Sequence, residues 1–192
     1  MSEPDPATDA SGHRARLRKR LADQGPEALQ DHELVEYLLA LAIPRRDTKP
    51  IARRLLAEFG GYGRLMAADA RTLARVGGLS EGAIAALKIA EAAALRLLRS
   101  KVADQPVLAS WQALLDYLHA DMAHRPTERV RALHLSGRNV LIRDELVAEG
   151  TIDQAAIHVR EIIRRAIDLS SAAIILVHNH PTRAFSSPPI HA

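Results

Sequence analysis

The chain has 192 residues, of which 47% are hydrophobic, and this length is compatible with one moderate core or two small ones. It contains no cysteine, which excludes a disulfide scaffold and thiolate metal ligands and fits a reducing cytoplasm. The formal net charge is +3, and no apolar run reaches the roughly 20 residues that a membrane helix needs. The acidic N-terminus lacks the features of a signal peptide, so we expect a cytoplasmic protein without a membrane span.

The first half of the chain has the spacing of helices. Residues 1–12 are rich in Pro, Asp, Ser and Ala without apolar periodicity, and they are expected to form a disordered tail. From there on, apolar residues recur every three or four positions, as Leu34, Leu38 and Leu41 do. The sequence therefore predicts a small all-helical domain over residues 13–100.

A glycine-containing turn lies within this helical domain. Gly77, Gly78 and Gly82 lie around an expected turn between two helices, where backbone N–H groups can face outward and hold phosphate. This pattern indicates a helix-hairpin-helix, although Ser80 stands where such hairpins usually carry their second glycine. An ordinary turn between packed helices is the alternative.

The basic surplus of the chain also lies in this half, in two clusters. One covers residues 14–20, and the other contains Arg45, Arg46 and Lys49. Clustered cations suit contacts with phosphates, and the aromatic content of 3% argues against base stacking on single strands. Duplex DNA, held through its backbone, is the expected nucleic-acid partner, and a solvated helical face is the alternative reading.

The second half begins after a polar stretch that contains proline. We place a linker at residues 101–106 and a second domain at 107–192, where the apolar spacing changes from helical to mixed. The expected elements are a helix at 111–118, strands at 130–135 and 140–142, an amphipathic helix at 159–169, and an apolar strand at 172–177 typical of burial on both faces. The predicted fold class is therefore α+β.

The last predicted strand runs into His178-Asn179-His180-Pro181. Residues i and i+2 of a strand point to the same side, so the two histidines can present their imidazoles to one metal ion. The proline ends strand pairing and leaves the histidines at an exposed edge. The pattern predicts part of a metal-binding centre with nitrogen and oxygen ligands.

Several segments of the chain resemble one family when they are taken together, in order and with their spacing. They are GHRARLR at 12–18, GPEAL at 25–29, IPRRDTKP at 43–50, EGT at 149–151, HVRE at 158–161 and HNHP at 178–181. They resemble the RadC family. The resemblance implies a helical N-terminal region followed by a JAMM (MPN-type) metallopeptidase domain with a cytidine-deaminase-like α/β fold, and it carries a link to DNA repair.

The resemblance also implies roles for individual residues. In JAMM peptidases two histidines and an aspartate hold zinc, and a distant glutamate acts as general base on peptide or isopeptide substrates. His178 and His180 match the zinc ligands, and Glu128, just before the first strand, matches the base. Glu149 and Glu161 are the rival candidates for the base. Their non-catalytic readings are a solvated loop charge for Glu149 and a carboxylate favoured in the first turn of a helix for Glu161.

The third zinc ligand departs from the JAMM pattern, which continues with a serine and, three residues later, an aspartate. Here Pro188 occupies the serine slot and His191 the aspartate slot. We expect a frameshifted or prematurely terminated domain, because a terminal segment with two prolines is a poor preorganised ligand. The alternative is that His191 is a substitute third ligand.

Three functions stay open at this point. The first is a zinc metallopeptidase with impaired activity. The second is a non-enzymatic DNA-binding protein that acts through the helical domain. The third is a degraded gene product without activity.

Overall fold

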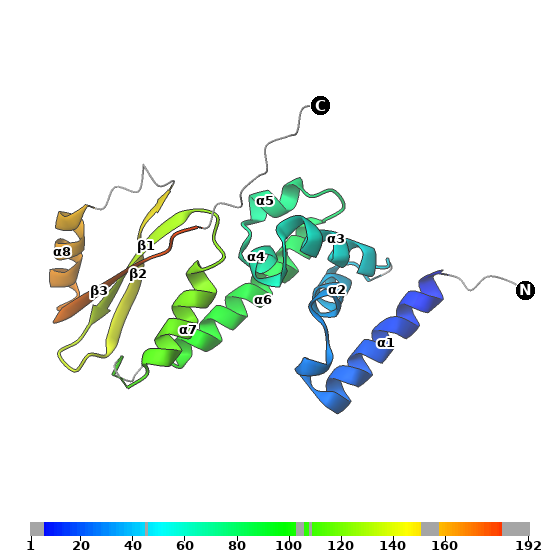
Figure 1. The fold of residues 1–192 in the computed structure, drawn as a ribbon, viewed down its shortest axis with the longest axis horizontal. Coiled ribbons are helices and arrows are strands. Elements are labelled where there is room, and N and C mark those ends of the chain that lie inside the picture. The colour runs from blue at the N-terminus through cyan, green and yellow to red at the C-terminus, as the bar shows by residue number, and fades with distance from the viewer. Residues whose placement is uncertain (1–5, 45, 103–105, 108, 151–157, 182–192) are drawn as a thin grey trace, which may run out of the picture. The chain divides into compact units, whose positions relative to one another are not determined.

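A computed structural model describes residues 6–44, 46–102, 106, 107, 109–150 and 158–181. The chain divides into two units, 1–94 and 95–192, and each is considered by itself (Figure 1). The division falls before the linker expected at 101–106, because Val102 is fully buried in the second core. No helix in the described part of the chain is long and apolar enough to cross a membrane.

The first unit is helical in all of its described elements, as the apolar spacing predicts. The helices are α1 (Pro6–Gln24), the 3₁₀ helix η1 (Pro26–Ala28), α2 (Asp31–Ala42), α3 (Lys49–Phe59), α4 (Tyr62–Ala67), α5 (Ala70–Arg75) and α6 (Glu81–Ser100), which continues into the second unit. Helix α1 begins at Pro6, inside the segment expected to be a disordered tail. Proline suits the first turn of a helix because the N–H that it lacks has no helical partner there.

The core of the first unit is formed where α2, α3 and the helices after them meet. Val35 and Leu39 of α2 and Leu55 of α3 are fully buried there, and the four-residue spacing puts the two α2 side chains on one helix face. Helix α3 ends at Gly60, whose left-handed backbone (φ 72°) is readily adopted by glycine.

Helix α1 is held to α2 largely by polar contacts. Leu17 is buried. Around it, Arg20 pairs with Glu33, and His13 Nε2 lies 3.0 Å from Glu36 Oε1. The docking of α1 therefore depends on charge as well as on apolar burial.

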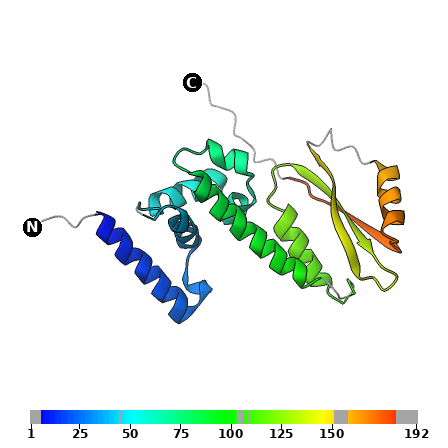
Figure 2. The same ribbon diagram turned by 180° about the vertical axis from the view of Figure 1, so that it is seen from behind.

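The second unit combines two helices with a small sheet. Its elements are α7 (Trp111–Met122), β1 (Glu128–Leu135), β2 (Leu141–Gly150), α8 (Val159–Asp168) and β3 (Ala173–His178), in the predicted order. The described strands have the order β2-β1-β3, and both pairs are antiparallel. Helices α7 and α8 lie on opposite faces of this sheet (Figures 1 and 2). The structure is thus a mixed α+β fold, as predicted.

Strand β2 is much longer than the 140–142 strand expected from the sequence. It starts after a tight turn in which Ser136 N donates to Val140 O at 2.9 Å, and it extends to Gly150. Its middle is charged, so apolar periodicity misses it. These charges have partners in the folded unit: Asp144 accepts from Tyr117 of α7 at 2.6 Å, and Glu145 accepts from Arg165 of α8 at 2.6 Å.

The expectation that the last strand is buried on both faces is wrong for β3. Ile175 and Val177 pack against the core on the α7 face, whereas Leu176, on the other face, is 51% exposed. Among the described residues β3 pairs only with β1, so it is an edge strand. A continuous apolar run does not reveal whether a second strand or helix covers it.

Candidate functional site

The end of β3 and the beginning of β1 meet at one edge of the sheet. The antiparallel register puts Val130 opposite His178. Glu128 and His180 each lie two residues beyond this pair, and the distance from Glu128 Oε1 to His180 Nδ1 is 3.6 Å. The structure therefore brings together the three residues that the sequence assigns to base and zinc ligands.

The two histidines lie against each other. The Nε2 atom of His178 is 2.9 Å from the Nε2 atom of His180, and the ring planes are inclined by 84°. Two ligand nitrogens at about 2.0–2.1 Å from a tetrahedral zinc ion lie about 3.3 Å apart. A small increase in the distance between the two Nε2 atoms would therefore let both nitrogens bind one zinc ion.

Asn179, between the histidines, closes onto β1. Its Oδ1 accepts from Arg129 N at 2.7 Å, and its Nδ2 donates to Thr127 O at 3.2 Å. These two main-chain groups flank Glu128. The contact was not expected from the sequence, because nothing in the HNHP segment indicates which strand it will meet.

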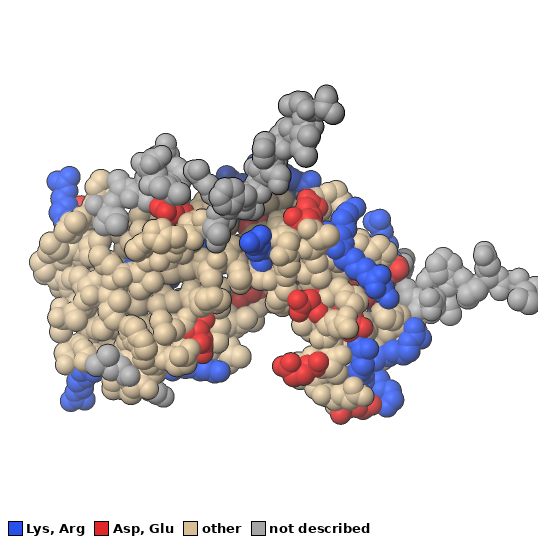
Figure 3. Space-filling view, in the orientation of Figure 1, with Lys and Arg blue, Asp and Glu red and all other residues tan. Residues whose placement is uncertain are grey.

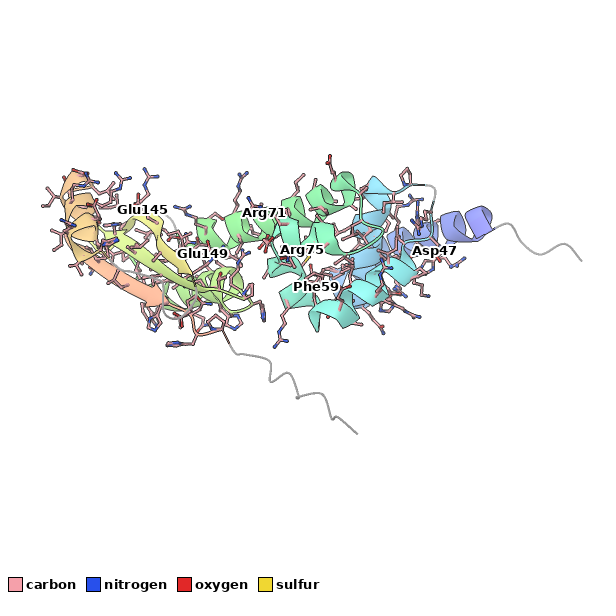
Figure 4. All side chains as sticks on the ribbon, turned by 90° about the horizontal axis from the view of Figure 1, so that it is seen from above. Asp47, Phe59, Arg71, Arg75, Glu145 and Glu149 are labelled. Carbon is pink, nitrogen blue, oxygen red and sulfur yellow. The ribbon has the colours of Figure 1, made fainter. Side chains whose placement is uncertain are left out.

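The alternatives for the base have other partners. Glu149 of β2, labelled in Figure 4, accepts from Arg129 Nε at 2.8 Å and is the cross-strand partner of that residue, on the face opposite to Glu128. Glu161 pairs with Arg164 of its own helix at 2.7 Å. Alternation along β1 thus separates Glu128 from Glu149.

The third ligand is not supplied by the described residues. Among the residues that the structure describes, no three His, Cys, Asp or Glu side chains are arranged to hold a metal ion. Pro188 and His191 lie outside the described residues. His178 and His180 thus fit two positions of a zinc site, and the described part of the chain leaves the site incomplete.

A second polar cluster lies on the same face of the sheet, beneath α8. His134 is buried, and its Nδ1 lies 3.1 Å from Ser171 Oγ. It borders a cavity of about 210 Å³ together with Glu145 and Arg165. The hydrogen bond from Arg165 lowers the pKa of Glu145 below its ordinary value. In Figure 4 Glu145 lies close to α8. Sequence reasoning missed this cluster because His134 sits inside an apolar strand.

In the first unit, two of the segments expected to contact DNA border one cavity. The cavity measures about 590 Å³, and Arg46 and Gly78 both line it with Ser80. Gly82 is close by, since a methyl group added there would lie 3.7 Å from Ala42 Cβ. Figure 3 shows Lys and Arg side chains gathered over α1 and α3 of this unit. Of the other expected contacts, Lys49 begins α3, Gly77 lies in the turn after α5, and Arg45 is outside the described residues.

Two arginine side chains donate hydrogen bonds to main-chain carbonyls in the segments around this cavity. Arg14 of α1 donates to the carbonyl oxygen of Ile43 at 3.1 Å and also to those of Pro44 and Arg46. Arg54 of α3 donates to the carbonyl oxygen of Gly77. The helix-hairpin-helix itself stays a prediction, since α5 and α6 flank the turn without establishing that motif.

Comparison with known proteins assigns a family to both halves of the chain. Residues 11–85 match the UPF0758 N-terminal family and residues 108–188 the RadC-like JAB domain. A UPF0758 protein of Rhodobacter capsulatus is 52% identical over 166 residues, which are 86% of this chain and 78% of that protein. A UPF0758 protein of Ruegeria pomeroyi is 49% identical over 170 residues, 88% of this chain and 76% of the relative. The chain therefore belongs to the RadC (UPF0758) family, with a RadC-like JAB domain in its second half.

Proposed function

We propose that the chain acts as a zinc-dependent hydrolase of the JAMM type, which cleaves a peptide or isopeptide bond of a peptide or protein substrate. The observation that carries the proposal is the 3.6 Å contact of Glu128 with His180, beside a histidine pair 2.9 Å apart. The match of residues 108–188 to the RadC-like JAB domain supports the same reaction class.

Each of the three side chains has a separate task in this proposal. His178 and His180 would hold zinc through ring nitrogens, and a zinc ion bound there would supply Lewis acidity and lower the pKa of a bound water towards neutral. Glu128 accepts the proton and returns it to the leaving amine. The Glu128 side chain is 16% exposed and that of His180 78%, so the proposed base is largely buried and the His180 ring is open to solvent.

Weak zinc binding and slow hydrolysis are expected. Catalytic zinc sites usually have three protein ligands, and the described residues offer two. The activity of this chain is therefore expected to depend on a third ligand that the described part does not supply.

The proposal is tested by zinc titration of the full chain and by a peptidase assay with peptide and isopeptide substrates. His178→Ala and His180→Ala should each weaken zinc binding by at least about tenfold. Loss of a residue that only hydrogen-bonds to a metal ligand already costs about that much. Glu128→Gln should retain zinc and lower turnover by about a hundredfold or more. His124→Ala, which removes an exposed histidine after α7, is the matched control and should change neither. Absence of zinc binding by the unmodified chain would overturn the proposal.

A second candidate function is binding of duplex DNA through the first unit, as in a role in DNA repair. The observation in its favour is the cavity that Arg46 and Gly78 share, since it joins a basic segment to a turn with exposed backbone. Cations and main-chain N–H groups contact phosphates without reading sequence.

Salt-dependent binding of a labelled duplex tests this second function. Replacing Arg45, Arg46 and Lys49 with alanine should weaken binding and reduce its dependence on salt concentration. The control is Arg138→Ala, which removes an exposed cation between β1 and β2, outside both basic clusters. Binding that does not respond to salt, or that responds equally to the control, would contradict this function.

A further inference from the structure

Asn179 has a fixed orientation between the two histidines. A main-chain N–H can only donate, so the amide oxygen of Asn179 must face Arg129 N, at 2.7 Å. A main-chain carbonyl can only accept, so the amide nitrogen must face Thr127 O, at 3.2 Å. Both ends of this short side chain therefore bind main-chain groups at the start of β1, one on Arg129 and one on Thr127, the residue before the strand.

These contacts continue the sheet beyond the end of β3 at His178. In a regular antiparallel ladder, every second pair of opposite residues exchanges two main-chain hydrogen bonds. Asn179 N donates to Arg129 O at 3.4 Å, but the return bond from Arg129 N goes to the side chain of Asn179. The side chain replaces one rung of the ladder, which leaves the main chain free to turn away at Pro181.

The two residues that Asn179 binds are the neighbours of Glu128 on either side. Holding Thr127 and Arg129 fixes the main chain of Glu128 beside His180, with the carboxylate 3.6 Å from the ring. We propose that Asn179 is a positioning residue that holds the general base Glu128 against the histidine pair; this inference rests on the proposed hydrolase function. Asn179→Asp keeps the acceptor and loses the donor, whereas Asn179→Ala loses both.

The cysteine-free chain offers a direct measure of this positioning. Glu128→Cys and His180→Cys together create the one cysteine pair of the protein. The Glu128 and His180 side chains already lie within 3.6 Å of each other, and a disulfide needs Cα atoms roughly 4.4–6.8 Å apart. The equilibrium between this disulfide and glutathione, measured on the full chain, reports how closely the two positions are held.

Asn179→Ala in this background should lower the disulfide equilibrium constant by about tenfold or more, because two hydrogen bonds are lost. Asn179→Asp should lower it less. A control pair, Ala132→Cys with Leu176→Cys, joins cross-strand partners nearer the middle of β1 and β3. Its equilibrium should change by less than about twofold. An unchanged 128–180 equilibrium in both Asn179 variants, or an equal fall in both cysteine pairs, would overturn the proposal.

A zinc measurement separates this inference from the proposed function. In the chain that retains Glu128, His178 and His180, Asn179→Ala should lower kcat by about tenfold while zinc affinity changes by less than about threefold. A purely structural role would lower zinc affinity and kcat together with thermal stability. If the unmodified chain binds no zinc, the proposed function falls, and the disulfide comparison still decides whether Asn179 positions residue 128.

Discussion

Tyr117 of α7 and Asp144 of β2 form a buried hydrogen bond of 2.6 Å. The other oxygen of Asp144 accepts from Arg131 Nε at 2.8 Å, and Asp121 accepts from Arg131 Nη1 at 2.7 Å. Burial and the bond to Asp144 raise the pKa of Tyr117 above its ordinary value, which favours the neutral phenol that donates this bond. This network fixes α7 on the sheet.

Tyr117→Phe is expected to lower the free energy of unfolding by about 1–2 kcal/mol, since Asp144 loses one donor and keeps Arg131. Arg131→Met should cost more, about 3–5 kcal/mol, because it leaves the buried Asp144 carboxylate without its cation and removes the nearer of the two arginines that pair with Asp121. Urea denaturation measures both. Asp116→Asn, on the exposed face of α7, is the control. A cost of Tyr117→Phe no greater than that of this control would refute the role given to the network.

The ion pair of Arg20 with Glu33 should make stability depend on pH. The hydrogen bond from Arg20 lowers the pKa of Glu33 from 4.5 to about 2. A depressed folded-state pKa means that the stabilisation is complete above pH 4.5 and is lost as the pH falls to about 2. Glu33→Gln keeps the bond to Gln30 N at the start of α2 and removes the charge. The difference in unfolding free energy between Glu33→Gln and the unmodified chain should therefore shrink over that range.

The matched control for this pH dependence is Asp23→Asn, which breaks an exposed pair with Lys19 and should change stability by less than about 0.5 kcal/mol. A difference between Glu33→Gln and the unmodified chain that stays constant with pH would show that the charge of Glu33 contributes nothing.

Gly78 and Gly82 should respond to alanine with opposite signs. Gly78 has φ 90°, and a methyl group there would lie 3.3 Å from Arg54 Nη2, so Gly78→Ala should destabilise by about 1–3 kcal/mol. Gly82 lies in the first turn of α6, where a methyl group meets Ala42 Cβ at an ordinary 3.7 Å. Gly82→Ala should therefore stabilise by about 0.5 kcal/mol. Melting temperatures measure both changes.

Gly82→Ala also tests DNA binding. If the turn holds phosphate through close backbone approach, Gly82→Ala should weaken duplex binding although it raises stability. An unchanged affinity for duplex DNA would remove Gly82 from the expected contacts.

His191→Ala decides between the two readings of the third zinc ligand. We expect zinc affinity to stay within about threefold of the unmodified chain, because His178 and His180 carry the binding. A loss of about tenfold or more would identify His191 as the substitute ligand instead. Zinc competition with a fluorescent chelator measures the difference.

The sequence predicts those features that depend on short-range periodicity. The helices of the first unit, the β1–β2 hairpin and the amphipathic α8 all follow from apolar spacing and turn residues. The pairing of His178 with His180 follows from the period of a strand. Glu128 is different, because no local pattern distinguishes it from Glu149. Family order points to Glu128, and in the structure the alternating faces of β1 separate the two carboxylates.

The features that the sequence did not predict depend on partners far along the chain. The charged middle of β2 is stable as a strand because Tyr117 and Arg165 come from helices on opposite faces. His134 is buried with Ser171, a residue 37 positions away. The exposure of Leu176 depends on what lies beside β3, which its own apolar run cannot indicate.

The link between β1 and β3 has a consequence for the order of folding. The two bonds of Asn179 to β1 close loops of 50 and 52 residues, whereas the β1–β2 hairpin closes over a tight turn. Loop closure entropy grows with loop length, so the hairpin is expected to form early and β3 to join late. Glu128 is then placed in the β1–β2 hairpin before His178 and His180 join it. Hydrogen exchange should find the amides that link β1 and β3 less protected than those that link β1 and β2.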